Sequence, residues 1–175
     1  LAQAGYSDPK TFPKVTLVYN TNTGHKLRME YIQAQIKQNL GIDLALENWE
    51  PQTYFRKVAT DHPQMFRVGW VADYPHPNNW LPEVFGTGAG QNYSQYSNPA
   101  FDDLNKKALA ETDQAKALAL YAEAQKILVE DAPAIWVYYY GIFRLVKPWV
   151  KGLITTPIDS YLGSQNWRNI QILAH

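Results

Sequence analysis

The first 50 residues alternate between β-type and helix-type hydrophobic patterns. Residues 15–19 form a short run rich in β-branched residues, and residues 42–46 alternate apolar and polar positions, so both are predicted strands. Between them, apolar residues recur at spacings of three, four and four, which is one face of a helix that ends at Gly41: Met29, Ile32, Ile36 and Leu40. Strand, helix and strand at this spacing predict a βαβ unit with parallel strands.

The next segment predicts one more helix and one more strand. Residues 52–60 carry a short helical pattern, and residues 65–73 form an apolar run that reads as a third strand. The two prolines of Tyr74–Asn79 favour a loop there, because proline disrupts both a helix and a strand ladder. Residues 86–97, rich in Gly, Asn, Ser and Tyr, predict a polar irregular stretch.

Two capped helices and several weaker strands complete the expected fold. Asn98 followed by Pro99 opens one helix, and Asp113 opens the next. The second helix is expected to share a face made of Leu118, Tyr121, Gln125 and Leu128. After Pro133, residues 134–140 are aromatic and β-branched and predict a strand, with weaker strand signals near Leu153 and Ile170. The prediction is an α/β fold with a mixed sheet and flanking helices.

Composition narrows the functional classes. Of 175 residues, 46% are hydrophobic and 18% are charged, which excludes an intrinsically disordered chain. Sixteen Lys and Arg balance sixteen Asp and Glu with no basic run, which argues against nucleic acid as a partner. Cysteine is absent, so disulfides, thiolate metal sites and cysteine nucleophiles are excluded. Six Trp and twelve Tyr exceed what a core of this size needs, which is typical of surfaces that bind sugars or peptides.

Sequence patterns for catalysis and metal binding are weak. No two of the four histidines lie at metal-ligand spacing, no serine lies in a GxSxG elbow, and Gly86–Gly90 lacks the Lys-Ser/Thr of a phosphate loop. Asp102 and Asp103, with Glu111 nearby, leave open a carbohydrate-active enzyme or binding module. However, Asp102 and Asp103 lie in a first helical turn, where negative charge stabilises the helix dipole and adjacent side chains diverge. No metal site and no cofactor are expected.

Asp73 is the strongest candidate for a binding group. It ends the largely apolar run 65–73 and comes just before the proline-containing loop Tyr74–Asn79. The predicted sheet would therefore position its carboxylate and partly remove it from water. A carboxylate in such a place needs a cation. The residues alone leave two interpretations open: a binding group, or a structural aspartate that forms a salt bridge with an internal Lys or Arg or a hydrogen-bonded turn.

An ordered set of motifs then resembles the oligopeptide-binding receptors of solute-binding protein family 5. The most specific piece is Gly69-Trp70-Val71-Ala72-Asp73-Tyr74-Pro75-His76-Pro77. It is preceded by Val18-Tyr19-Asn20 and Leu40-Gly41-Ile42, and followed by Tyr96-Ser97-Asn98-Pro99-Ala100-Phe101-Asp102 and Leu120-Tyr121-Ala122-Glu123-Ala124-Gln125. Tyr138-Tyr139-Tyr140 and Arg144-Leu145-Val146-Lys147-Pro148-Trp149-Val150 complete the set. Each piece alone is weak, but their order across the chain is specific.

The resemblance implies part of a two-lobed receptor with a periplasmic-binding-protein type II fold. Residues 1–142 would belong to the second ligand-binding lobe, and residues 143–175 would be a C-terminal tail that returns to the first lobe. The implied function is non-enzymatic: an extracytoplasmic subunit of an ABC importer that binds short peptides and delivers them to the permease subunits in the membrane. The implied complete receptor is a monomer, either periplasmic or lipid-anchored on the outer face of the cytoplasmic membrane.

The resemblance also assigns roles to residues. Asp73 would pair with the α-ammonium group of the peptide, and the main chain at Gly69, Trp70 and Val71 would add the peptide as an extra strand. Tyr140 matches a ligand-contacting tyrosine near the hinge, and Trp70 would also shape a side-chain pocket.

How a ligand carboxylate is held is an open question in the sequence. Residues 61–65, where relatives can place a cation, offer His62 but no Arg or Lys, and His25 is another candidate. A receptor of the same family for an oligosaccharide or a nickel chelate is the nearest alternative.

Overall fold

The computed structural model describes residues 1–141, 143–154 and 167–174. Contacts within the chain divide it into two compact units, Leu1–Gly69 and Trp70–His175. Among the helices of these described ranges, none is long and apolar enough to cross a bilayer. The elements of the first unit are β1 (Val15–Asn20), α1 (Thr23–Leu40), β2 (Leu44–Trp49), α2 (Pro51–Thr60) and β3 (Met65–Phe66). Those of the second are α3 (Pro82–Phe85), α4 (Pro99–Ala110), α5 (Gln114–Asp131), β4 (Val150–Lys151) and β5 (Gln171–Ile172).

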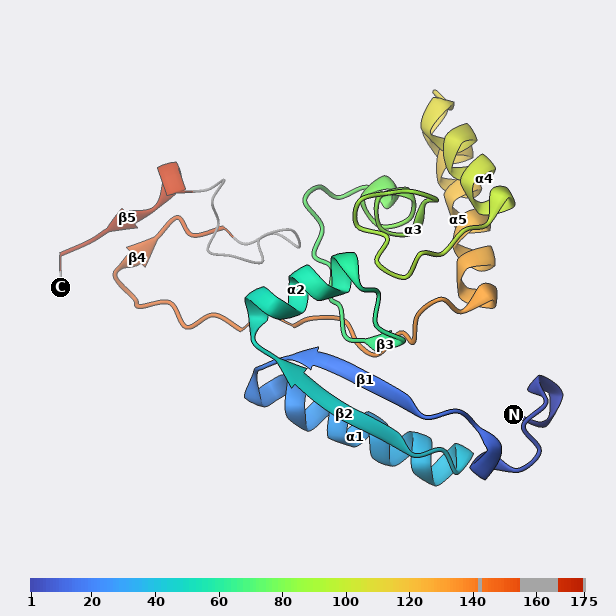
Figure 1. Ribbon diagram of the computed structural model, residues 1–175. Helices are drawn as coiled ribbons and strands as arrows, with labels where there is room; N and C mark the ends of the chain where they lie inside the picture. The colour runs from blue at the N-terminus through green and yellow to red at the C-terminus, as the bar shows by residue number, and fades with distance from the viewer. Residues whose placement is uncertain (142, 155–166, 175) are drawn as a thin grey trace. The chain divides into compact units, whose positions relative to one another are not determined.

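The first unit is built on a parallel three-stranded sheet. The strand order is β2-β1-β3, with Leu17 opposite both Leu46 and Met65. Helix α1 runs along one face of β1 and β2 (Figure 1). Its Met29 is buried against Leu17 and Tyr19 of β1. The predicted βαβ unit with parallel strands is therefore confirmed, although β2 begins two residues later than expected.

Both ends of α1 are fixed by residues that the sequence marks. The Asn22 side chain accepts hydrogen bonds from the backbone N–H groups of Gly24 and His25. At the other end Gly41 has a φ of 72°, a left-handed conformation that closes the helix and that other residues rarely adopt. Because α1 begins three residues after β1 ends, its positive dipole end lies next to the carboxyl end of β1.

The third strand is much shorter than predicted, and the expectation of a strand over residues 65–73 is wrong beyond Phe66. The pairing of Met65 with Leu17 and of Phe66 with Val18 means that β1, which ends at Asn20, offers no partner beyond Val68. The buried Tyr54 hydroxyl donates to the Arg67 carbonyl, which takes the place of a ladder bond. Burial raises the pKa of Tyr54 to about 12.

The second unit has its core between α4 and α5, which lie side by side (Figure 1). Asn98 and Asp113 cap the two helices as predicted, each accepting two backbone hydrogen bonds. The buried core is centred on Phe101 of α4 and packs with Leu81, Ala108, Tyr121, Ala124 and Leu128. Of the four residues predicted to share the buried face of α5, two are confirmed. Tyr121 and Leu128 are buried, but Leu118 and Gln125 are exposed and alanines at 117 and 124 take their place, because small residues let α4 approach closely.

Residues 134–140 do not form the predicted strand in the described part of the chain. This segment is extended but has no assigned ladder partner, and six of its side chains, from Ile135 to Tyr140, are exposed. A β-type composition favours extended backbone, whereas a strand also needs a partner that the pattern does not specify. Near the weaker signals at Leu153 and Ile170, β4 and β5 pair antiparallel. The predicted tail 143–175 includes residues 155–166 and 175, which lie outside the described residues, as does Ile142 at its boundary.

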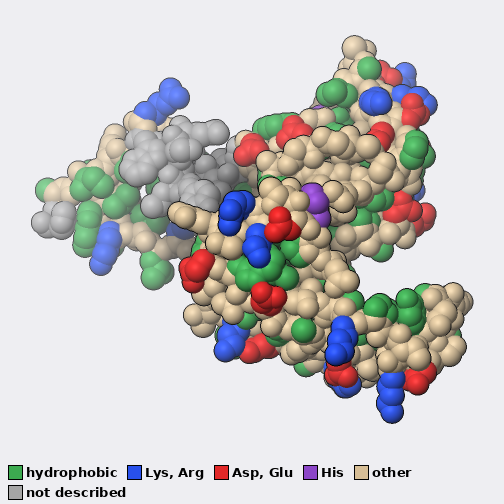
Figure 2. Space-filling model, viewed as in Figure 1, with side chains coloured by type: hydrophobic (Ala, Val, Ile, Leu, Met, Phe, Trp, Pro, Cys, Tyr) green, Lys and Arg blue, Asp and Glu red, His purple; other side chains and the backbone are tan. Residues whose placement is uncertain are grey.

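The α/β class is confirmed, but the described strands form two separate sheets, one parallel and one antiparallel, rather than one mixed sheet. Parallel pairing is confined to β2-β1-β3, and the antiparallel pair is β4 with β5. On the face shown in Figure 2, positive and negative side chains are interspersed. This agrees with the balanced composition and favours recognition through local groups.

Candidate ligand-binding site

The segment that carries Asp73 folds back on itself. Residues 70–76 run into a short 3-10 turn, Pro77–Asn79, and then into α3. Pro77 begins this turn because its fixed φ suits a first helical position. The loop predicted for Tyr74–Asn79 is thus confirmed, with a single helical turn at its end. The fold-back brings the Asn79 side chain into contact with Asp73.

Asn79 is the centre of this turn. Its side chain is fully buried, at 0% exposure. Its Oδ1 accepts from the Asp73 backbone N–H at 2.8 Å and from the Trp70 indole Nε1–H at 3.3 Å. Its Nδ2 donates to Asp73 Oδ2 at 3.2 Å and to Glu83 Oε2 at 2.6 Å. One amide therefore holds the ring of Trp70, the backbone and carboxylate of Asp73, and the carboxylate of Glu83.

Glu83 at α3 is fixed by three donors. Besides Asn79, the Asn78 amide donates to Glu83 Oε1 at 2.9 Å and the Tyr74 hydroxyl donates to the same oxygen. The hydrogen bond to Glu83 raises the pKa of Tyr74, because removing the phenolic proton would leave two anions in contact. The turn thus carries two carboxylates, and Glu83 is the one already satisfied by neighbouring groups.

Asp73 is the exposed carboxylate of the pair. Throughout the described residues, the ion pairs of the chain lie elsewhere and none involves Asp73 or Glu83. An exposed carboxylate that is held in place and has no internal cation can accept charge-assisted hydrogen bonds from a ligand cation such as an ammonium group. The structure links Asp73 and Trp70 through Asn79, and it adds Glu83 to the same network. The sequence analysis missed both Asn79 and Glu83.

The main chain just before Asp73 is outside any ladder in the described ranges. Gly69 and Val71 are exposed, and Trp70 is half-buried. Gly69 is the last residue of the first unit and Trp70 is the first of the second. A backbone segment without a strand partner is what the addition of a peptide strand requires.

Tyr140 lies in the exposed segment that follows α5. Its side chain is 48% exposed, and its ring packs edge-on against Tyr138 with centroids 5.0 Å apart. Among the described ring contacts, its neighbour is thus another residue of the same segment. Its predicted role in ligand contact stays a prediction.

His25 belongs to a basic group at the carboxyl end of β1 in the first unit. Its Nδ1 lies 3.2 Å from the Asn20 carbonyl oxygen, and Arg67 Nη1 lies 3.5 Å from the side-chain oxygen of the same asparagine. Partial burial lowers the pKa of His25, and the positive charges of Arg67 and Arg28 lower it further. Arg67, two residues beyond the range 61–65, is a cation of this group that the sequence analysis did not single out. His62 is exposed in the turn after α2.

The acidic residues of α4 and its end do not converge. Asp102 Oδ1 accepts the Thr87 backbone N–H at 3.1 Å, and Asp103 forms an ion pair with Lys107 at 2.6 Å. Glu111 accepts the backbone N–H of Asp113 at 2.9 Å. A glycosidase needs two carboxyl groups facing one another across a cleft. These side chains instead serve local structure. In the described residues there is likewise no group of three or more His, Asp or Glu that could hold a metal ion.

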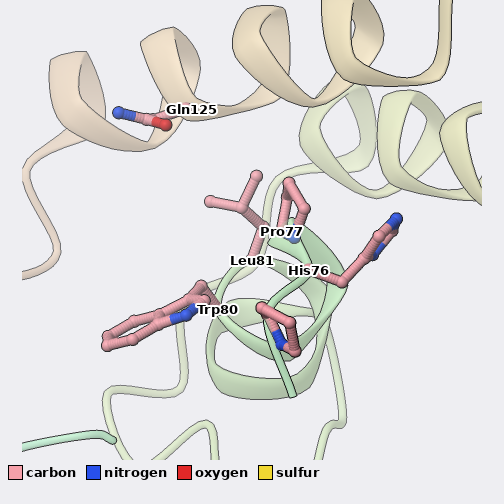
Figure 3. Close-up of a pocket in the computed structure, with 6 residues that line it drawn as sticks. His76, Pro77, Trp80, Leu81 and Gln125 are labelled. Atoms are coloured by element: carbon pink, nitrogen blue, oxygen red, sulfur yellow. The ribbon is translucent and has the colours of Figure 1, made fainter. Parts of the chain in front are cut away.

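An open pocket of about 350 Å³ lies between the turn and α5 within the second unit (Figure 3). It is lined by Pro75, His76, Pro77, Trp80, Leu81 and Gln125. No Asp, Glu, Lys or Arg lines it, so its chemistry suits an apolar group rather than the charged end of a ligand.

The chain is similar to known bacterial solute-binding proteins. The model of the bacterial extracellular solute-binding proteins, family 5, matches residues 1–92. The periplasmic murein peptide-binding protein MppA of Escherichia coli is 38% identical over 91% of this chain, and the periplasmic oligopeptide-binding protein OppA of the same organism is 36% identical over all of it. The chain spans less than a third of the length of these two relatives, 29% and 31%.

The fold agrees with the sequence matches. The structure of Haemophilus influenzae OppA in complex with the peptide RPPGFSPFR superposes with a TM-score of 0.84 at 32% identity, over 99% of this chain and 33% of that one. The predicted fold, part of a type II periplasmic binding protein, is therefore confirmed. The relatives compared here are binding proteins by name.

Proposed function

The chain belongs to the family 5 bacterial extracellular solute-binding proteins, and from this membership we propose that it forms part of a receptor that binds short peptides. The two relatives above bind murein peptides and oligopeptides by name. The observation that carries the proposal is the Asp73 carboxylate, exposed, held by Asn79 and without an internal cation in the described chain.

Asp73 is proposed to bind the α-ammonium group of the peptide. All linear peptides with a free amino terminus carry this group, so a receptor that accepts many sequences can use it as a common anchor. An ammonium group donates up to three hydrogen bonds, and those to a carboxylate are charge-assisted, with a net value of roughly 1.5–3 kcal/mol. N-acetylation removes both the charge and two of the donors.

The backbone of Gly69, Trp70 and Val71 is proposed to pair with the extended peptide. Such pairing uses main-chain groups that every peptide has, so it does not depend on the peptide's side chains. Trp70 is half-buried, and its indole is fixed by Asn79, so it can form one wall of a side-chain pocket. Tyr140 is proposed as a further ligand contact.

His25 is proposed as a partner for a ligand carboxylate, with Arg67 as a second cation of the same unit. A carboxylate suits a helix amino terminus flanked by an arginine. The Asn20 carbonyl only accepts hydrogen bonds, so His25 Nδ1 donates to it and Nε2 stays available on the neutral ring. A bound carboxylate would favour protonation at Nε2, which then donates to the ligand.

The proposed biological setting follows from the family. The receptor is non-enzymatic, uses no cofactor, acts as a monomer in the periplasm or anchored to the outer face of the cytoplasmic membrane, and hands its peptide to the permease subunits of an ABC importer. In the full receptor, residues 1–142 are proposed to belong to the second lobe and residues 143–175 to the tail that returns to the first.

Calorimetric titration of the protein in its full encoded length tests the proposal. The titrants are a short peptide and its N-acetylated form, and the proteins are wild type, D73N and D103N. We expect wild type and D103N to prefer the free peptide, and D73N to bind it roughly ten- to a hundredfold more weakly. Asp103 is a matched control because it is an exposed carboxylate already paired with Lys107.

Equal affinity for the free and acetylated peptides, or no effect of D73N, would show that Asp73 does not hold the amine. Binding of an oligosaccharide or a nickel chelate in place of peptides would assign the receptor to a non-peptide solute of the same family.

A further inference from the structure

We propose that Asn79 is a positioning residue that orients the Asp73 carboxylate for the ligand and is itself oriented by Glu83. This inference rests on the proposed function, because it concerns how the ammonium anchor is held. Its basis is the fully buried amide, whose two donors and one acceptor oxygen all meet partners on the turn: Trp70, Asp73 and Glu83.

The orientation of the Asn79 amide is dictated by its neighbours. On one side lie the indole N–H of Trp70 and the backbone N–H of Asp73, which only donate. On the other side lie two carboxylates, which only accept. Only an oxygen facing the first pair and an NH₂ facing the second satisfies all four. Glu83, held by Asn78 and Tyr74 as well, fixes where that NH₂ group lies.

This amide fixes Asp73 in two places. It binds both the backbone N–H and Oδ2, so the χ1 and χ2 torsions of an exposed side chain are restrained before any ligand arrives. No described donor contacts Oδ1, which leaves that oxygen for the ligand. A preorganised carboxylate loses less conformational entropy on binding, and this raises affinity for the group that it contacts.

A purely structural role for Asn79 would have a different consequence. An amide that only closes the turn would, when removed, destabilise the protein and weaken all ligands alike. An amide that orients Asp73 acts on the ammonium alone. The readout that separates the two is the ratio of affinities for free and N-acetylated peptide, because the acetylated peptide does not use the carboxylate in the same way.

The experiment measures this ratio in the full-length receptor for wild type, N79A, D73N and the double variant. We expect N79A to lower the ratio about tenfold, through weaker binding of the free peptide at nearly constant affinity for the acetylated one. In the D73N background, N79A should have no further effect on the ratio, because the two residues act through one contact. An unchanged ratio in N79A, or full additivity in the double variant, would overturn the inference.

The control is N105A, since Asn105 is a second buried amide of the same unit that donates within α4 to the Phe101 carbonyl at 2.8 Å. It should reduce stability and leave the ratio unchanged.

A measurement on wild type covers the case in which N79A does not fold. The side-chain NH₂ resonances of Asn79 should shift when the free peptide is added, and much less with the acetylated one. Resonances that do not respond to the free peptide would overturn the inference. If wild type itself fails to distinguish the two peptides, the proposed amine anchor is wrong, which is a separate result from an unchanged ratio in N79A.

Discussion

The surroundings of the His25 imidazole lower its pKa from the ordinary value of 6.5. Burial is the largest cause, Arg67 and Arg28 act in the same direction, and the hydrogen bond to the Asn20 carbonyl opposes the shift without reversing it. The unfolded chain therefore binds this proton more tightly than the folded one between the lowered pKa and 6.5. Stability from neutral His25 is fully present above pH 6.5 and is lost as the pH falls through that window.

Urea unfolding at pH 7.5 and at pH 5 measures this effect. We expect H25Q to lose less stability than wild type on acidification, because glutamine has no proton to gain. H62N is the matched control: His62 is exposed, has a φ of 45° that asparagine tolerates, and should leave the acid sensitivity unchanged. An H25Q variant with the acid sensitivity of wild type would contradict the prediction.

Residues differ in how much of their role local sequence reveals. Asp73 could be singled out because a carboxylate at the end of an apolar run is unusual in itself. Asn79 could not, because asparagine after proline is ordinary turn chemistry. Its role exists only once the fold-back brings Trp70, Asp73 and Glu83 around it. Arg67 was missed for the same reason, since its proximity to His25 arises from the pairing of β3 with β1.

At the scale of elements, the longer helices α1, α2, α4 and α5 were predictable, whereas the short α3 and two strands were not. Helix ends depend on residues within a few positions, as Asn98 and Gly41 show. A strand depends on a partner distant in sequence. The run at 65–73 stops pairing where β1 ends, and the run at 134–140 has no ladder in the described residues. The hydrophobic pattern alone shows neither where a partner strand ends nor whether a partner strand exists.

The end of α3 offers a test at this scale. The Gly86 N–H donates to the Pro82 carbonyl at 3.0 Å, and a Cβ on Gly86 would lie 2.4 Å from that oxygen. Its φ of −61° is ordinary, so the conflict is purely steric. The Gly86 carbonyl also accepts from the buried Asn92 side chain at 2.9 Å. We expect G86A to displace this turn and to lower the free energy of unfolding by about 1–3 kcal/mol.

Chemical denaturation of G86A beside G90A provides the comparison. Nothing lies within 4 Å of a Cβ built on Gly90, so that variant should change stability by no more than about 0.5 kcal/mol. Equal stability of the two variants would mean that the α3 turn can move without cost, and that its packing does not hold Asn92 in place.

At the scale of the whole molecule, the excess of aromatic residues has a structural explanation. Much of it lies in the segment after α5, where Trp136 is 54% exposed and Tyr139 is fully exposed, followed by fully exposed Phe143 and Leu145. Large apolar side chains that are this exposed, and this close in sequence, are typical of surfaces that pack against another part of a protein. The relatives are more than three times as long as this chain. We propose that this segment packs against parts of the receptor beyond these 175 residues.

Hydroxyl-radical footprinting of the 175-residue chain and of the full-length receptor tests this proposal. In the full-length receptor we expect the modification of Tyr139 and Phe143 to fall severalfold, because buried rings react slowly, and the 175-residue chain to bind hydrophobic dyes more strongly. Tyr31 is the internal control: it is 66% exposed on α1, and its rate should be similar in both proteins. Unchanged reactivity of Tyr139 and Phe143 would show that the segment stays exposed in the receptor. Its aromatic rings would then remain available to a ligand or partner rather than forming an interface within the receptor.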